Sequence, residues 1–276
     1  MTLLPHPVTG DLFASPVPAG TGWPDDPAPP ATPVARTPAD VRRSAGSVLS
    51  LTDLDAQVSV CSACPRLVTW REDVAAAKRA SYAGEPYWGR PMAGWGSPTP
   101  RVLIVGLAPA ANGGNRTGRI FTGDRSGDWL FASLHRVGLA AQPTSEHAGD
   151  GQRLIDTRMI AAVRCAPPDN KPTTAERDTC APWIETEVAL VAPSVRAIVA
   201  LGSYGWDAAL RSFKAAGFSV PRPKPRFGHG ASASLTRDGQ DVVLLGSYHP
   251  SQQNTFTGRL TEPMLDEVLG RAAALR

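Results

Sequence analysis

A short apolar run followed by a long glycine-rich loop constrains the fold of this chain most. Val102–Leu107 is apolar and follows Pro100, which is typical of a strand buried inside a parallel sheet. The loop after it is rich in glycine, asparagine and aspartate, and Ser126 or Asp128 can cap a helix that begins near Trp129. Open α/β sheets bind ligands beyond the carboxyl ends of such strands. The segment therefore predicts a strand, a polar binding loop and a helix start.

The rest of the chain alternates between strand and helix patterns. Apolar runs predict further core strands near 158–164, 195–202 and 241–250, and a possible hairpin strand at 231–236. Helical spacing appears on both sides of the CSAC tetrapeptide and again near 128–138, 203–216 and 262–275, whereas Pro182 interrupts a helix expected to reach Val191. This alternation predicts a three-layer α/β/α sandwich with a mainly parallel sheet of about four strands.

The first 46 residues differ in composition from the remainder. They are rich in Pro, Ala, Gly and Thr without a sustained period, which predicts a disordered tail before a folded domain at 47–276; a partner-binding arm is the alternative. No apolar run is long enough to cross a bilayer and no export signal is visible, so a cytoplasmic location is expected. The net charge is +3 and the acidic excess lies in the first sixty residues, so the remainder is mildly basic and compatible with nucleic acid.

The chain contains only four cysteines, and in a protein without an export signal these indicate metal ligands before disulfides. Cys61 and Cys64 have the C-x2-C spacing that lets two thiolates reach one metal centre, whereas Cys165 and Cys180 are widely separated. Structural zinc sites usually use two close pairs, but an iron–sulfur cluster tolerates wider spacing because it is larger than one ion. The spacing alone leaves a cluster and a zinc ion equally favoured, with four unrelated buried thiols as the remaining possibility.

Several motifs, taken together, identify a family. The segments GLAPAANGGNRTGRIFTGD, CAPPDNKPT and SYHPSQQNTFTGRLT, with the four cysteines in the same order, resemble the type B uracil-DNA glycosylases, the fifth family of the uracil-DNA glycosylase superfamily. The resemblance spans about residues 50–265. It implies a 4Fe-4S cluster on Cys61, Cys64, Cys165 and Cys180. It also implies removal of uracil, and of other deaminated bases such as hypoxanthine and xanthine, from double-stranded DNA by a protein expected to be a monomer.

The resemblance also implies roles for individual residues in cleaving the N-glycosidic bond. Asp124 would position water or stabilise the sugar cation, and His249 would donate a hydrogen bond to the base O2. Asn170 offers a donor and an acceptor that match uracil, and Phe121 would stack on the flipped base. Each has an ordinary alternative: Asp124 a helix cap, His249 and Phe121 packed side chains, Asn170 a turn residue. The base would also lie against the loop start, Gly106, Leu107 and Ala108.

The start of this loop departs from other superfamily members. They often place Asp, Asn or Glu early in the loop, whereas the apolar residues here cannot activate water. Catalysis would therefore rest on Asp124, His249 and backbone donors, which is the type B pattern. Asn112 stands where several relatives have a histidine, so a role of that histidine does not carry over.

The DNA contacts implied by the resemblance follow the HPS tripeptide. This loop would enter the minor groove and fill the space left by the flipped base, although it offers amides and Phe256 in place of a leucine wedge. The contacts expected for this loop and for phosphates are Ser251, Gln252, Gln253, Asn254, Arg259 and Arg116, with the basic loop at 222–229 as a further candidate.

Two other functions remain open. A nucleotide hydrolase would use the glycine-rich loop as a phosphate cradle, but neither G-x-x-x-x-G-K-[ST] nor G-x-G-x-x-G is present. A non-catalytic iron–sulfur protein that senses DNA lesions on the same fold is the main alternative.

Overall fold

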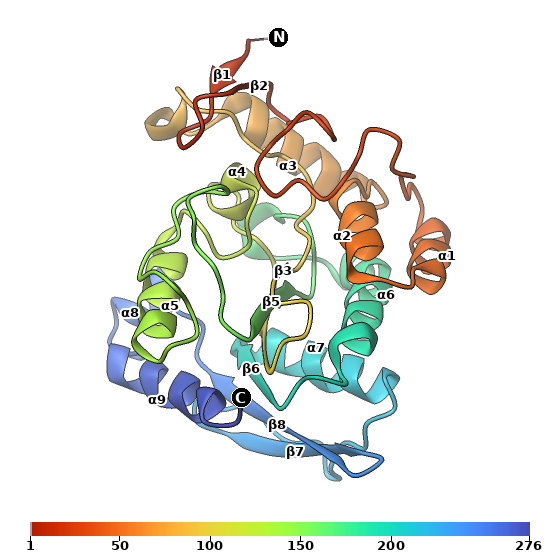
Figure 1. Cartoon of the computed structure of the whole chain (residues 1–276), viewed down its shortest axis with the longest axis vertical. Coiled ribbons are helices and arrows are strands. Elements are labelled where there is room, and N and C mark those ends of the chain that lie inside the picture. The colour runs from red at the N-terminus through yellow and green to blue at the C-terminus, as the bar shows by residue number, and fades with distance from the viewer. Residues whose placement is uncertain (1) are drawn as a thin grey trace.

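The centre of the molecule is a six-stranded sheet in the order β3-β5-β4-β6-β8-β7 (Figure 1). The computed structural model describes residues 2–276. The four inner strands are parallel: β5 (Thr157–Ala161), β4 (Val102–Gly106), β6 (Ala197–Leu201) and β8 (Gln240–Ser247). The edge strands β3 (Trp95–Gly96) and β7 (Ser232–Arg237) are antiparallel to their neighbours. The predicted α/β sandwich with four parallel strands is confirmed, and the two edge strands complete a mixed sheet.

Helices cover both faces of this sheet. On one face, α5 (Arg125–Arg136) and α9 (Glu262–Ala273) pack against alternate strand residues such as Ile104 and Val199. On the other, α6 (Thr174–Val191) and α7 (Gly202–Ala215) pack against Leu103, Val105 and Ile198. Since both faces are buried, the inner strands are mostly apolar, which explains their apolar runs.

Two helices begin or continue differently from the prediction. Helix α5 begins at Arg125 with Asp124 as its N-cap, not near Trp129 after Ser126 or Asp128. Helix α6 begins with the capping box of Thr173 and Glu176 and continues through Pro182. A proline inside a helix removes one backbone hydrogen-bond donor. The helix is nevertheless continuous, and it packs against α1 and α7.

The N-terminal residues are packed and not disordered. Residues 2–37, here called the N-terminal segment, include the paired strands β1 (Leu4–Pro5) and β2 (Leu12–Phe13), and α1 (Pro38–Ser47) follows with a Thr37–Asp40 capping box. Phe13, Val17 and Trp23 are buried against Trp88, Met92 and Ala148 of the main domain. The structure therefore contradicts the disordered tail and the boundary at residue 46 for residues 2–46; Met1 lies outside the described residues.

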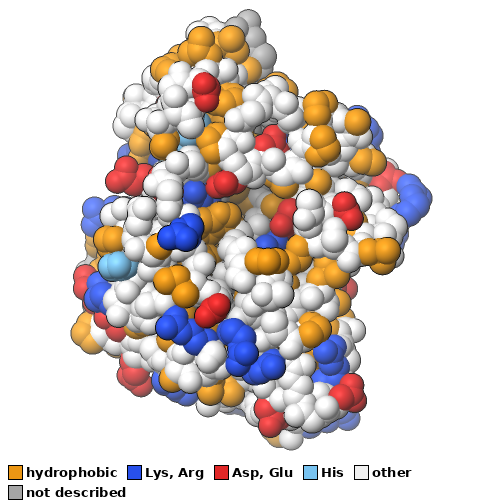
Figure 2. All heavy atoms as spheres, viewed as in Figure 1, with side chains coloured by type: hydrophobic (Ala, Val, Ile, Leu, Met, Phe, Trp, Pro, Cys, Tyr) orange, Lys and Arg blue, Asp and Glu red, His pale blue; other side chains and the backbone are white. Residues whose placement is uncertain are grey.

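The remaining elements connect these layers. The CSAC tetrapeptide lies between α2 (Leu51–Ser59) and α3 (Pro65–Ala77), as predicted. The short elements are η1 (Ala80–Tyr82), α4 (Gly114–Thr117), η2 (Pro168–Asn170) and α8 (Gln252–Thr255). None of the helices within residues 2–276 combines the length and the apolar character that a membrane crossing requires. The surface in Figure 2 mixes both charges, with Lys and Arg side chains gathered below a central hollow.

Candidate active site

The polar motifs meet at one edge of the sheet. Because β4, β5, β6 and β8 are parallel, the loops after them leave from the same side. Backbone pairing extends past the strand ends, since Ala162 N donates to Gly106 O at 3.0 Å and Val163 N to Leu107 O at 2.9 Å. The start of the glycine-rich loop is therefore fixed against the loop that follows β5.

Phe121 and His249 lie together beside Gly106. Their ring centroids are 6.2 Å apart with 36° between the planes. A Cβ added to Gly106 would lie 2.5 Å from Phe121 Cζ, so only glycine lets the phenyl ring rest on the end of β4. Phe121 has a φ of 54°, a left-handed conformation that is uncommon for a bulky residue and typical of functional loops. The structure thus brings together Gly106, Phe121 and His249 from distant parts of the sequence.

Asp124 caps a helix and lines a pocket at the same time. Its Oδ1 accepts hydrogen bonds from Ser126 N at 2.9 Å and Gly127 N at 3.0 Å. Its Oδ2 would lie 2.2 Å from a Cβ on Gly113, so this glycine makes room for the second oxygen. Burial raises the pKa of Asp124, opposed by the two backbone hydrogen bonds and by Arg116. Asp124 is therefore the N-cap of α5 through Oδ1, and Oδ2 takes no part in the cap.

The pocket beside Asp124 has a wall that the sequence did not reveal. Pro7 and Val8 of the N-terminal segment line it together with Asp124 and Arg116. Arg116 is buried and its guanidinium donates to Glu85 Oε1 at 2.9 Å, Gly123 O at 2.8 Å and Asn112 O at 2.9 Å. This side chain supports the loop from inside, which corrects its predicted role as a phosphate contact.

His249 is a neutral imidazole at neutral pH. Burial lowers its pKa to about 4. Asn254 Nδ2 donates to the His249 carbonyl at 2.8 Å, and a Cβ on Gly202 would lie 3.7 Å from His249 Cβ. The backbone of the SYHPS turn is thereby fixed between α8 and the start of α7.

Asn170 lies on the loop after β5, which leaves the sheet on the same side as the glycine-rich loop. It ends η2 with a φ of 56° and is exposed, and its side chain makes no hydrogen bond within residues 2–276, so the amide is free. Asn112, at the position of the relatives' histidine, instead accepts a hydrogen bond from the buried Tyr87 hydroxyl at 3.0 Å. Ala108 is half-buried and packs against a small cluster of Leu67, Val163 and Cys165.

The predicted DNA loop forms α8 and its flanks. Gln252, Gln253 and Arg259 are exposed, whereas Ser251 and Asn254 are half-buried. Phe256 is 68% exposed, Arg125 lies 5.4 Å from its ring centroid, and Arg259 lies 4.5 Å from that of Tyr248. An exposed aromatic ring next to an arginine is a suitable surface for nucleic acid.

The four cysteines line one pocket between α1, the CSAC turn, α3, α6 and the loop after β5. All are free of disulfides, and burial raises the pKa of Cys64 to about 12 and also raises that of Cys165 and Cys180. No three His, Cys, Asp or Glu side chains in the described part of the chain are arranged to hold a single metal ion. The four predicted cysteines therefore line one pocket, but their side chains are not arranged as ligands of a single metal ion.

Two buried arginines that the sequence did not single out adjoin this pocket. Arg71 Nη1 donates to Cys165 Sγ at 3.2 Å and to Cys61 O at 3.1 Å, and Arg164 N donates to Cys180 Sγ at 3.3 Å. Within the described residues, Arg71 Nε, Arg164 Nε, Arg164 Nη1 and Trp183 Nε1 are buried without a hydrogen-bond acceptor. Buried donors are rarely left unpaired, so the site fits an additional acceptor-rich group between the sulfurs.

Comparisons with known proteins agree with this geometry. A family model described as the uracil DNA glycosylase superfamily matches residues 93–272. The chain belongs to this superfamily. The type-5 uracil-DNA glycosylase of Mycobacterium tuberculosis is 58% identical over 270 residues, 98% of each chain. Those of Thermus thermophilus and Pyrobaculum aerophilum are 50% and 44% identical over 79% and 78% of this chain and 94% and 88% of their own.

Membership of the uracil DNA glycosylase superfamily confirms the family inferred from the motifs. The matched segment begins just before β3 and ends within α9, so it holds the whole sheet and both site loops. The N-terminal segment and the CSAC tetrapeptide precede it.

Proposed function

We propose that this protein hydrolyses the N-glycosidic bond of deoxyuridine in double-stranded DNA, and that hypoxanthine and xanthine are also substrates. The observation that carries the proposal is the meeting of Gly106, Phe121 and His249 at the strand ends of a uracil DNA glycosylase fold. The protein acts as a monomer in the cytoplasm during base excision repair. A base must leave the helix before its sugar bond can be reached, so the site receives a flipped nucleotide.

Phe121 and His249 act on the base. The flipped ring stacks on Phe121, and stacking is tolerant of base identity, which suits several deaminated bases. As the glycosidic bond breaks, negative charge collects on the base, and His249 donates a hydrogen bond to O2. A neutral imidazole is the right form for this, because the departing uracil anion, whose charge is shared between N1 and O2, needs a hydrogen-bond donor but no permanent charge. The free amide of Asn170 pairs with uracil O4 and N3–H, a pattern that cytosine reverses.

Asp124 acts on the sugar and the water. Positive charge develops on the sugar in the transition state, and a carboxylate nearby stabilises it. With Oδ1 fixed by Ser126 N and Gly127 N, Oδ2 is oriented to hold the attacking water. The helix N-terminus thus fixes the angle of the carboxylate, while its two backbone hydrogen bonds and Arg116 oppose the rise in the pKa of Asp124 that burial causes.

A panel of duplexes tests this function. Each duplex carries uracil, hypoxanthine, xanthine or a thymine mismatch, and free base and alkali-labile strand breaks are measured without added nucleotide or magnesium. We expect release from the first three duplexes. Tight binding without base release would select the lesion sensor. In a separate assay that supplies nucleotide and magnesium, magnesium-dependent nucleotide turnover would select the hydrolase.

We also propose that Cys61, Cys64, Cys165 and Cys180 hold a 4Fe-4S cluster. The support is the shared pocket and the unpaired donors of Arg71, Arg164 and Trp183 around it. Bound to four thiolates, the cluster would cross-link the CSAC turn to α6 and to the loop after β5. Anaerobically purified protein should be brown with broad visible absorption and contain about four irons per chain. Colourless protein with one zinc per chain would contradict this proposal.

A further inference from the structure

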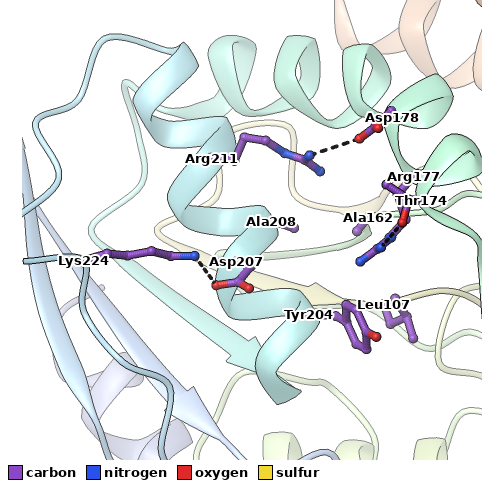
Figure 3. A pocket seen from close by; sticks show the side chains of 10 residues that line it. All are labelled: Leu107, Ala162, Thr174, Arg177, Asp178, Tyr204, Asp207, Ala208, Arg211 and Lys224. Carbon is purple, nitrogen blue, oxygen red and sulfur yellow. Dashed lines mark hydrogen bonds and ion pairs between the residues drawn. The ribbon is translucent and has the colours of Figure 1, made fainter.

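A charged groove lies between α6 and α7, next to the site but outside it (Figure 3). Its cations come from three elements: Arg177 from α6, Arg211 from α7 and Lys224 from the loop before β7. Tyr204 from the first turn of α7 and Leu107 from the glycine-rich loop lie side by side at its end. The groove continues toward Lys214 and Arg222, which line the neighbouring pocket.

The groove starts at the active site. Helix α7 begins where Gly202 faces His249, and a Cβ on Gly205 would lie 2.5 Å from Val105 O. Tyr204 lies between these two glycines and is 52% exposed. The first turn of α7 therefore joins the base site to Tyr204, and Arg211 follows about two turns further along the same helix.

The cations of the groove are available to an anion. Arg211 lies 3.6 Å from Asp178 and Lys224 lies 2.7 Å from Asp207, and all four side chains are 47–63% exposed. Exposed pairs of this kind contribute about 0–1 kcal/mol, so they exchange readily for a stronger partner. Arg177 donates to Thr174 Oγ1 at 2.8 Å, faces the Tyr204 ring at 5.2 Å and leaves its buried Nε without an acceptor in the described part of the chain.

We infer that this groove binds the phosphate backbone of the DNA strand that carries the target base, with Arg177, Arg211 and Lys224 on phosphates and Tyr204 against a flanking nucleotide. The inference deepens the proposed function and rests on it. The groove and its continuation contain five basic residues and two acidic ones, Asp178 and Asp207, so their net charge is positive. Arginine side chains can bind the phosphates of an unstacked strand, and an exposed aromatic ring can stack on its bases. Phosphate contacts of this kind position the strand without reading its sequence.

The test compares the double variant Arg177→Gln/Arg211→Gln and the single variant Tyr204→Ala with the wild type. Uracil release is measured on a long duplex and on a substrate reduced to the target nucleotide and its two phosphates. On the long duplex we expect the double variant to raise KM about tenfold with kcat unchanged. The short substrate should be cleaved equally well by all forms. The slope of log affinity against log salt should fall by about 0.9 for each lost phosphate contact.

Arg153→Gln is the matched control, because this exposed arginine precedes β5 at the opposite edge of the sheet. An unchanged KM and salt slope in the double variant, with unchanged melting temperature, would overturn the inference. The inference would also be overturned if Arg153→Gln changed KM and the salt slope as much as the double variant does. The loss of any surface positive charge would then explain the result. Binding of uracil-free duplex, followed by fluorescence anisotropy, reports on the groove even if no base is released, so failure of the groove and failure of the proposed function are distinguishable.

Discussion

At the scale of single residues, Asp124 has two roles that one substitution can separate. Asparagine caps helices about as well as aspartate, but it carries no charge for the sugar cation. We expect Asp124→Asn to lower kcat by about 10²- to 10³-fold while the melting temperature stays near that of the wild type. Asp124→Ala should lose the cap as well and cost about 1 kcal/mol of stability.

The control for this prediction is Asp128→Asn, which changes an exposed carboxylate in the first turn of the same helix. It should leave kcat unchanged. Equal turnover of Asp124→Asn and wild type, measured under single-turnover conditions, would remove Asp124 from the catalytic role.

His249 gives a second prediction at this scale. Because burial lowers its pKa to about 4, the imidazole should titrate well below the ordinary value of about 6.5. Ring resonances followed by NMR from pH 7 downward should therefore shift with a midpoint near 4, and His249→Ala identifies them. A midpoint near the ordinary value would mean that the ring is exposed to solvent and not buried.

At the scale of elements, the junction of β4 with the Phe121 ring can be tested directly. Gly106→Ala places a Cβ 2.5 Å from Phe121 Cζ, so the ring must move off the strand end. We expect kcat/KM to fall by at least about 10-fold, since small misplacements in a site are costly. Gly46→Ala in α1 meets nothing within 4 Å and should leave activity intact; an active Gly106→Ala enzyme would show that Phe121 is not the stacking platform.

The elements themselves could largely be predicted because their patterns are local. Continuous apolar runs located the four inner strands, and helical spacing of apolar residues located α7 and α9. The start of α5 was misplaced because Ser126, Asp128 and Asp124 are all good caps, and only the chain path selects Asp124. Within the site, Arg71 and Cys165 lie 94 positions apart in the sequence, so no spacing rule could pair them. Arg116 looked like a surface cation until its three internal acceptors were known.

At the scale of the whole molecule, the N-terminal segment was the largest error of prediction. Its composition is that of a disordered chain, yet Phe13, Val17 and Trp23 are spaced to reach one hydrophobic cluster. Ion pairs fix it further, since Asp26 binds Arg90 with distances of 2.8 and 3.0 Å. Composition averages over such a segment and misses a few large side chains whose partners lie far along the chain.

The attachment of this segment should depend on pH. His147 is buried beside His6, with ring centroids 4.3 Å apart, and burial lowers the pKa of both, that of His147 to about 3. The unfolded chain binds protons near pH 6.5 and the folded chain does not, so stability is lost as pH falls from about 6.5 toward 3.

His147→Phe should reduce this loss, which chemical unfolding at pH 7 and pH 5 can measure. Limited proteolysis at the same two pH values should cut the wild type first within residues 2–37 at the lower pH. An acid sensitivity identical in His147→Phe and wild type would place its cause elsewhere in the protein.

The docking of the first residues onto later ones has a consequence for synthesis. Phe13 and Trp23 leave the ribosome long before Ala148, the last member of their cluster. At about 5–20 residues per second, they wait on the order of ten seconds for that partner. Throughout this interval the nascent chain exposes aromatic side chains whose partners lie between Trp88 and Ala148, and a chaperone that recognises such side chains would find its target there.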